Sequence, residues 1–228
     1  MKNRLPFEIL YEDRDVIVID KPAGLLTTQT RAKESNTAEA YLNDYVRKGQ
    51  WKSRKQVWLV HRLDRETSGV LMFAKTEAVA EWFRSKWNEV TEKIYQARVD
   101  GVLEEEKGVF ESWLLEDADG YRVRSVPAPA KGKGQTGTKG GRQPKFSRTE
   151  WRRLSVEAGT TRVEVSLKSG RKNQIRVHFS EAGHPVLGDV KYGGPRAKRL
   201  YLHALRLGFR HPHSGQWMVL ESHQANMI

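Results

Sequence analysis

The sequence predicts an α+β fold built on a mixed, mainly antiparallel sheet. Short apolar or alternating runs, which are typical of strands, recur along most of the chain, whereas only three segments read as helices. Strands and helices do not alternate strictly, so a parallel sheet assembled from βαβ units is not expected. With 228 residues, the chain is long enough to bury a full hydrophobic core.

The predicted strands are short and either apolar throughout or alternating. They span residues 15–19, 57–60, 70–73, 93–99, 109–116, 121–126, 149–156, 161–167, 200–209 and 216–221. The polar segments 117–120 and 157–160 each contain a glycine and favour hairpin turns between neighbouring strands.

Two helices are predicted over residues 36–48 and 77–88, and a short third helix follows a loop within residues 169–185. Asn36 is expected to cap the first helix, with the Glu39 side chain reaching back to it. In the second helix, Lys86 falls on the otherwise apolar inner face.

The charge of the chain favours a polyanionic partner. Its formal net charge is +12, from 40 Lys and Arg residues against 28 Asp and Glu residues. Nucleic acid fits this excess best, since no basic amphipathic helix supports the alternative of an anionic membrane surface. The absence of cysteine excludes disulfides and thiolate metal sites. No segment resembles a signal peptide or a membrane span, so we expect a cytoplasmic protein.

Residues 127–145 predict a flexible basic loop. The segment has three prolines, several glycines and almost no apolar residues. Its cations either contact RNA phosphates or remain solvated, and they are Lys131, Lys133, Lys139, Arg142 and Lys145.

The segment from Val60 to Val70 is the strongest candidate for a catalytic site. Asp64 lies between Arg62 and Arg65, in a polar loop that joins two predicted core strands. A carboxylate on a rigidly mounted loop is well placed for chemistry. The alternative is half of a structural ion pair in an ordinary turn.

Residues 61–69, HRLDRETSG, resemble the signature of the RluA family of pseudouridine synthases. Further blocks match in the family's order, and they are 20–24 (DKPAG), 170–178 (GRKNQIRVH), the run from Gly183 to Gly193, Leu202-His203-Ala204 and His211-Pro212. Four ordered blocks are far more specific than any one motif. The resemblance implies a sheet with a central catalytic cleft. It also implies a single catalytic domain over residues 1–228, without the small N-terminal RNA-binding domain of some members.

The resemblance implies isomerisation of specific uridines in structured RNA, either ribosomal RNA, transfer RNA or both, to pseudouridine. That reaction breaks the N1–C1′ bond and joins C1′ to C5 without net redox change, so no cofactor and no metal are expected. Asp64 would act as a nucleophile at C1′ or C6 of the nucleotide, or as a base in an elimination route. The expected partner is RNA, and the protein is expected to be a monomer that does not bind membranes.

Two residues are expected to act with Asp64. Arg176 matches the arginine of the family's Q-I-R motif, which the resemblance implies pairs with the catalytic aspartate. Such a cation would help a buried carboxylate to stay ionised. Tyr95 is similar to the family's active-site tyrosine and could stack on the base or relay a proton. The alternatives are a surface arginine and an ordinary inward-facing tyrosine.

The remaining predicted site residues bind RNA or the target base. The resemblance suggests that Arg62 fills the space left by the flipped uridine, although a phosphate contact is the competing possibility. Phosphate contacts are predicted for Lys21, Arg171 and Lys172, which could equally be solvated charges. His61 and Ile175 are further predicted contacts with RNA or the base. The chain departs from the family at Asn173, where histidine is common.

Two rival functions remain open. A non-catalytic RNA-binding protein could keep the same fold, and another carboxylate enzyme, such as a nucleoside hydrolase, could cleave glycosidic bonds. The hydrolase is disfavoured because glycosidases usually need two placed carboxylates, and no second one accompanies Asp64. The pair His211 and His213 lacks the spacing of a metal motif.

Overall fold

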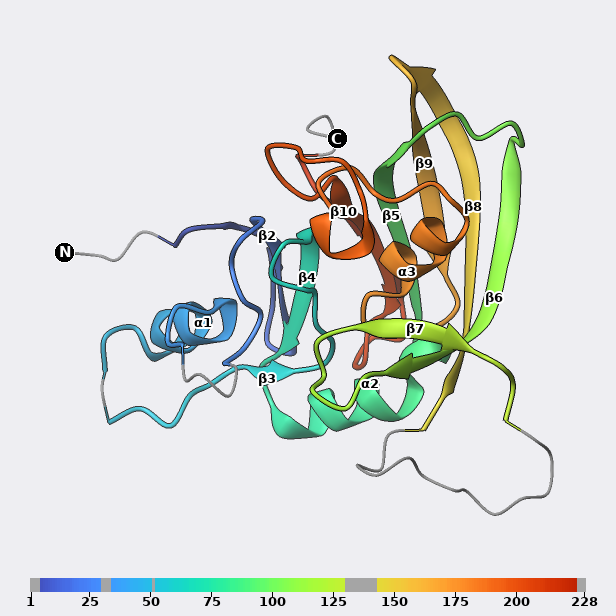
Figure 1. The fold of residues 1–228 in the computed structure, drawn as a ribbon. Helices are drawn as coiled ribbons and strands as arrows, with labels where there is room; N and C mark the ends of the chain where they lie inside the picture. Colours follow the sequence, from blue (N-terminus) through green and yellow to red (C-terminus); the bar gives the residue numbers. More distant parts are fainter. Residues whose placement is uncertain (1–4, 30–33, 51, 130–142, 225–228) are drawn as a thin grey trace. The chain divides into compact units, whose positions relative to one another are not determined.

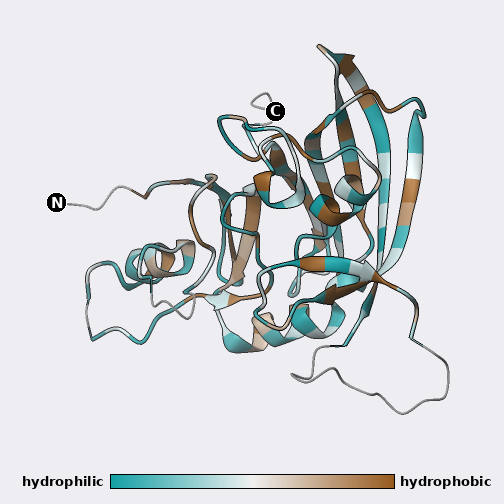
Figure 2. Ribbon diagram, in the orientation of Figure 1, coloured by the Kyte–Doolittle hydropathy of each residue, from teal (hydrophilic) through white to brown (hydrophobic). Residues whose placement is uncertain are grey.

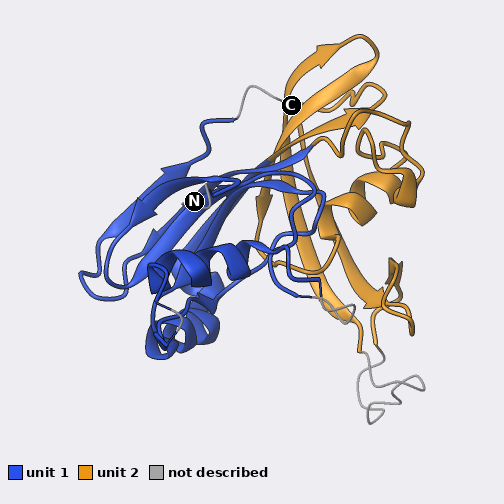
Figure 3. Ribbon diagram, turned by 90° about the vertical axis from the view of Figure 1, so that its left-hand side faces the viewer, with its two compact units in different colours: residues 1–95, 202–228 blue, residues 96–201 orange. Residues whose placement is uncertain are grey.

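The computed structural model describes residues 5–29, 34–50, 52–129 and 143–224 (Figure 1). The chain divides into two compact units (Figure 3). Unit 1 comprises Met1–Tyr95 and Leu202–Ile228, and unit 2 comprises Gln96–Tyr201. The predicted α+β class is confirmed, since three described α-helices accompany strands that pair mainly antiparallel. None of these helices is long and apolar enough to cross a membrane.

The sheet of unit 1 is organised around one central strand. Its strands are β1 (Glu8–Glu12), β2 (Val16–Lys21), β3 (Trp58–Leu59), β4 (Ser68–Ala74), β10 (Leu202–Arg210) and β11 (Trp217–Glu221). One edge of β4 pairs with β2 from Gly69 to Ala74. The other edge pairs in parallel with β10 at the start and antiparallel with β3 at the end. Strand β1, which the sequence did not predict because it is only partly buried, pairs with β2.

Helices cover both faces of β2 and β4. Alternate side chains of the two strands enter two separate apolar clusters. Helix α2 (Glu77–Val90) covers one cluster through Ala80 and Phe83, and helix α1 (Ala38–Arg47) covers the other through Ala38 and Leu42. Burial on both faces explains why residues 16–19 of β2 and 70–74 of β4 are uninterrupted apolar runs rather than alternating ones (Figure 2).

Two details of the predicted helices are wrong. Thr37 rather than Asn36 caps α1, and its hydroxyl accepts a hydrogen bond from the Ala40 N–H at 3.1 Å. The bridge between Leu26 and Thr37 fixes this residue in the extended conformation that an N-cap requires. In α2, Lys86 is exposed over the Trp82 ring, and Trp87 packs inward in its place.

Unit 2 contains four adjacent antiparallel strands and one covering helix. Its strands pair in the order β9 (Thr160–Leu167), β8 (Lys145–Glu157), β6 (Lys107–Glu116) and β7 (Val123–Val126). Strand β5 (Thr91–Asp100) begins in unit 1 and ends in unit 2. Helix α3 (Gln174–Glu181) packs on β7 and β8 and contacts the 3-10 helix η1 (Val190–Tyr192).

Both predicted hairpin turns of unit 2 are present. The Asp117 N–H donates to the Arg122 carbonyl at 2.9 Å, which closes the turn between β6 and β7. In the turn between β8 and β9, Ala158 and Gly159 both have positive φ, as a tight turn of the primed type requires.

Most of the predicted basic loop lies outside the described residues. Residues 130–142 hold four of its five cations, Lys131, Lys133, Lys139 and Arg142. The fifth, Lys145, is the first residue of β8, so the strand begins within the segment that the sequence assigned to a loop.

Candidate active site

Asp64 lies, partly buried, on the loop between β3 and β4. The Thr67 N–H donates to the Asp64 carbonyl at 3.2 Å, which tightens the loop into a turn. Arg65, one of the two flanking arginines, is exposed and pairs with Glu34. The other, Arg62, is exposed as well. The ion pair of Arg65 is therefore with Glu34.

The Lys21 side chain binds the backbone of the Asp64 loop and does not face solvent. Its side chain is 0% exposed, and its Nζ donates to the carbonyls of Pro22, Leu25 and Arg65 at 3.0, 2.8 and 3.1 Å. The Gly24 N–H donates to the same Arg65 carbonyl at 2.8 Å. The predicted phosphate contact of Lys21 is wrong, because its ammonium is buried against backbone carbonyls next to Asp64.

Gly69, the last residue of the HRLDRETSG segment, allows close pairing between β4 and β10. Gly69 has φ +112°, and a Cβ added there would lie 2.2 Å from the Ala204 carbonyl oxygen on β10. Only glycine permits both this backbone conformation and the close parallel pairing. The loop that carries Asp64 is thus fixed to β10 where it enters β4.

Tyr95 lies near Asp64 within unit 1, as the sequence predicts. Burial, and then the negative charge of Asp64, raises the pKa of the Tyr95 phenol. The phenol therefore keeps its proton at neutral pH, where it can donate a hydrogen bond but is a poor base.

His61 is a structural residue in this geometry. Its Nε2 accepts a hydrogen bond from the Met72 N–H at 3.0 Å, and its ring stacks on Trp87 with centroids 4.6 Å apart. Burial, with a smaller contribution from the Lys93 cation, lowers the pKa of His61 to about 3, so the ring is neutral. These contacts give His61 a role in the support of β4, and its contact with RNA stays a prediction.

Arg176 is buried on α3, which rules out the alternative of a surface arginine. The side chain forms a bidentate ion pair with Asp189, with Nε and Nη2 each 2.7 Å from a carboxylate oxygen. Its Nη1 donates to the Asn173 Oδ1 at 3.2 Å, and its guanidinium lies 5.1 Å from the centre of the Tyr192 ring. Arg176 and Asp189 are only 8% and 1% exposed, so the head group is held rigidly in a desolvated setting.

The three residues around Arg176 also bind one another. The Tyr192 hydroxyl accepts from the Asn173 side-chain amide at 3.0 Å and from the Val123 N–H at 3.0 Å. Asn173 has φ +54°, a left-handed conformation that asparagine tolerates better than most residues. Asn173, where the family often has histidine, thus connects Arg176 to Tyr192. We define Asn173, Asp189 and Tyr192 as the arginine cage.

Buried polar side chains attach α3 to β8. The Gln174 amide donates to the Thr149 hydroxyl and the Arg148 carbonyl at 2.9 and 3.0 Å. His178 Nδ1 lies 2.8 Å from the same Thr149 hydroxyl, and burial lowers the pKa of His178 to about 4. Gln174, His178 and the cage residues all belong to the matched family blocks, but their sequence positions alone do not reveal these contacts.

The other predicted RNA contacts differ in their surroundings. Arg62 and Arg171 are exposed, and the Arg171 Nε donates to the Phe146 carbonyl at 3.2 Å. Lys172 is exposed but pairs with Glu116 at 2.5 Å, which partly neutralises it. Ile175 is 3% exposed. The contacts of these residues with RNA stay predictions.

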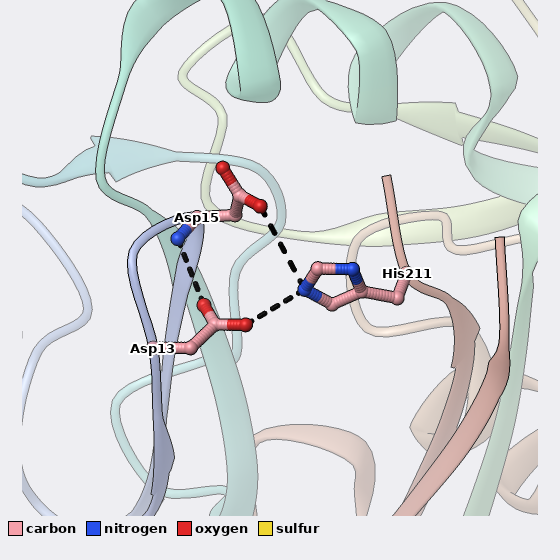
Figure 4. A group of neighbouring side chains, drawn as sticks. All are labelled: Asp13, Asp15 and His211. Atoms are coloured by element: carbon pink, nitrogen blue, oxygen red, sulfur yellow. Dashed lines mark hydrogen bonds and ion pairs between the residues drawn. The ribbon is translucent and has the colours of Figure 1, made fainter. Parts of the chain in front are cut away.

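Within the described part of the chain, Asp13, Asp15 and His211 form a group with metal-ligand chemistry (Figure 4). His211 Nδ1 faces the N–H groups of His213 and Ser214 at 3.3 and 3.2 Å, so this nitrogen is an acceptor. A neutral imidazole then carries its proton on Nε2, which lies 2.7 Å from Asp13. That proton occupies the position that a metal would need. The arrangement therefore favours a hydrogen bond between the β1–β2 turn, which carries Asp13, and the β10–β11 turn, which carries His211, over a metal site.

The chain belongs to the RNA pseudouridylate synthase family, whose model matches residues 15–181. Two solved human structures show the same fold. RNA Pseudouridylate Synthase Domain Containing 4 matches with a TM-score of 0.74 and 22% identity, and the match covers 94% of this chain and 87% of that chain. Domain Containing 1 has a TM-score of 0.70 and 24% identity, with 95% and 82% covered.

Curated relatives place the chain in the RluA group of this family. The dual-specificity RNA pseudouridine synthase RluA of Yersinia pestis is 35% identical over 215 residues, which cover 91% of this chain and 94% of that protein. The ribosomal large subunit pseudouridine synthase D of Nitrosomonas europaea is 35% identical over 231 residues, which cover 96% and 62%. The chain is thus an RluA-type RNA pseudouridine synthase, an isomerase that converts uridine in RNA to pseudouridine.

Proposed function

We propose that Asp64 is the catalytic carboxylate and that Tyr95 and Arg176 act with it at the target uridine. The observation that carries this proposal is the mounting of the Asp64 loop. The loop is fixed at Arg65 and Gly69, and a protonated Tyr95 lies within range of the Asp64 charge. A carboxylate fixed in this way can meet a reacting atom without first ordering a flexible loop.

The reaction needs a carboxylate and a controlled proton. Asp64 acts as a nucleophile at C1′ or C6, or as a base in an elimination route, and the N1–C1′ bond breaks. The uracil then turns so that C5 bonds to C1′, C5 loses its proton and N1 gains one. Tyr95 supplies a neutral phenol that can hydrogen-bond the base or relay this proton. Arg176 is assigned as the partner cation of Asp64 on the family resemblance, and within unit 2 it is held by Asp189.

We infer that the substrate is structured RNA, with ribosomal RNA, transfer RNA or both as targets. One relative is named for the large ribosomal subunit and the other for dual specificity. The net charge of +12 supports binding to an RNA backbone through counterion release. Exposed Arg62 next to Asp64 would occupy the stack that the flipped uridine leaves, and Arg171 would contact phosphates.

The test is tritium release from RNA labelled at uridine C5, with a parallel assay for free uracil. The wild-type protein should release tritium without uracil, which separates isomerisation from hydrolysis. Asp64→Asn keeps the size of the side chain and removes its charge, so turnover should vanish while RNA binding survives. Pseudouridine formed by a clean Asp64→Asn preparation would contradict the assignment of Asp64.

The target is tested separately. Pseudouridines are mapped in ribosomal and transfer RNA from cells with and without the gene. We expect defined sites to disappear from one or both classes, and the class that is unchanged is excluded as a substrate.

A further inference from the structure

We propose that Thr27 is a positioning residue for Asp64, and that its one hydroxyl sets the backbone on which the carboxylate is mounted. This inference rests on the proposed catalytic role of Asp64. Thr27 lies three residues beyond the DKPAG block and has no part in the chemistry proposed above.

The hydroxyl of Thr27 satisfies both backbone groups of the residue before Asp64. Thr27 Oγ1 donates to the Leu63 carbonyl at 2.8 Å and accepts from the Leu63 N–H at 3.2 Å. Thr27 and Leu63 are 2% and 4% exposed, so water has little access to these groups. A side chain that binds the donor and the acceptor of one residue fixes the rotation of that residue, which a single hydrogen bond would leave free.

Thr27 is itself anchored to a rigid element. The Thr27 carbonyl accepts from the Glu39 N–H at 3.0 Å, and the neighbouring Leu26 carbonyl accepts from the Ala38 N–H at 2.8 Å. Both donors are at the start of α1, where amides have no partner within the helix. The hydroxyl therefore transmits the position of α1 to the Asp64 loop.

Asp64 lies between two fixed points. Thr27 holds Leu63 on one side, and Lys21 with Gly24 holds the Arg65 carbonyl on the other. Fixing both neighbours restricts the direction of the Asp64 side chain. A displacement of about 1 Å in a reacting group can lower a rate by about a hundredfold, so this restriction bears directly on turnover.

The experiment compares Thr27→Val with a matched substitution in unit 2. Thr161, which is 0% exposed, also accepts from one N–H, that of Leu103 at 3.0 Å, and donates to one carbonyl, that of Gly101 at 2.8 Å. Thr161→Val thus removes two hydrogen bonds of the same kinds, one accepted and one donated by the hydroxyl, at a site outside the proposed chemistry. Valine keeps the volume of threonine in both cases.

We expect Thr27→Val to lower kcat by about tenfold or more, while KM for RNA stays within about twofold. Thr27→Ser, which keeps the hydroxyl, should recover most of kcat. Thr161→Val should lower the unfolding midpoint by a similar amount and leave kcat unchanged. All proteins are assayed well below their unfolding midpoints, so that the fraction folded does not enter the comparison.

The proposal is overturned by a wild-type kcat in Thr27→Val, by an equal loss of kcat in Thr161→Val, or by a Thr27→Ser variant as slow as Thr27→Val. If Thr27→Val does not fold, Thr27→Ala is measured instead, and a wild-type kcat in it overturns the proposal as well. Asp64→Asn is run in parallel. Turnover by Asp64→Asn would refute the proposed function itself, whereas a dead Asp64→Asn with a normal Thr27→Val refutes only the role of Thr27.

Discussion

Asp64 in unit 1 and Arg176 in unit 2 are held in opposite ways. The Asp64 loop is fixed through its backbone, by a hydroxyl at Leu63 and by Lys21 at Arg65. Arg176 is fixed through its own head group, by the carboxylate of Asp189 and the amide of Asn173. The first arrangement fixes the backbone from which the Asp64 side chain extends, and the second fixes the guanidinium group at the tip of the Arg176 side chain.

This difference predicts how much the loss of one side chain should destabilise each region. Loss of a neutral hydrogen bond in a buried position costs about 1–3 kcal/mol, mainly because the remaining partner is left unsatisfied. Loss of one member of a buried ion pair costs about 3–5 kcal/mol, because a charge is left uncompensated. Loss of one side chain from the ion pair of the arginine cage should therefore destabilise the protein more than loss of the Thr27 hydroxyl, although both serve the same proposed reaction.

The largest effect is expected from Arg176→Ala. It leaves Asp189 as a buried, unpaired carboxylate and should lower the free energy of unfolding by about 3–5 kcal/mol. Activity should be lost, because the proposed partner of Asp64 is gone. Urea unfolding and tritium release measure the two effects.

The control for this prediction is Arg152→Ala, whose side chain is exposed and pairs with Glu164 at 2.8 Å. An exposed pair contributes about 0–1 kcal/mol, so stability and activity should hardly change. Equal losses in the Arg176 and Arg152 variants would show that burial does not distinguish the two pairs.

A smaller effect is expected from Asn173→Gly. Glycine accepts the φ of +54° without strain and removes the amide that connects Arg176 to Tyr192. We expect kcat to fall several-fold, with a loss of stability of about 1–2 kcal/mol from the two hydrogen bonds. Asn173→Ala removes the same bonds and adds backbone strain, so it should be the less stable of the two variants. If both variants keep the wild-type kcat, the amide has no part in orienting Arg176.

The two regions also differ in how far the sequence could predict them. Asp64 and Arg176 are predicted as site residues because they match family blocks, and Tyr95 because it matches the family's K-x-Y context. The hydroxyl of Thr27 could not be assigned, since it acts on a backbone segment 36 residues away that becomes its neighbour only after folding. Lys21 was misassigned for a similar reason, because a lysine at the end of a strand gives no sign that three carbonyls will enclose it. The strands of the α+β fold were predictable from their apolar runs, whereas β1 was missed because its burial is only partial.

The smallest effect is expected from the pH dependence of stability, to which one histidine in each unit, His61 and His178, contributes. Burial lowers the pKa of His61 in unit 1 to about 3 and that of His178 in unit 2 to about 4. The Lys93 cation lowers the first further, whereas Glu181 opposes the shift in the second. Below about pH 6.5 both histidines bind protons in the unfolded chain, whereas in the folded chain they stay neutral. The free energy of unfolding should therefore fall as the pH decreases toward the two lowered pKa values.

Between pH 7.5 and 5.0, each histidine should contribute a loss on the order of 1–2 kcal/mol. His61→Phe keeps a ring against Trp87 and His178→Gln keeps polar atoms near Thr149, and each removes one titrating group. Urea unfolding at the two pH values should show a reduced pH dependence in both variants. At pH values below 4, where His178 begins to accept its proton and His61 does not, the reduction should be larger for His61→Phe. An unchanged pH dependence in His61→Phe would mean that the ring is protonated in the folded protein, and that its hydrogen bond from Met72 is not maintained in acid.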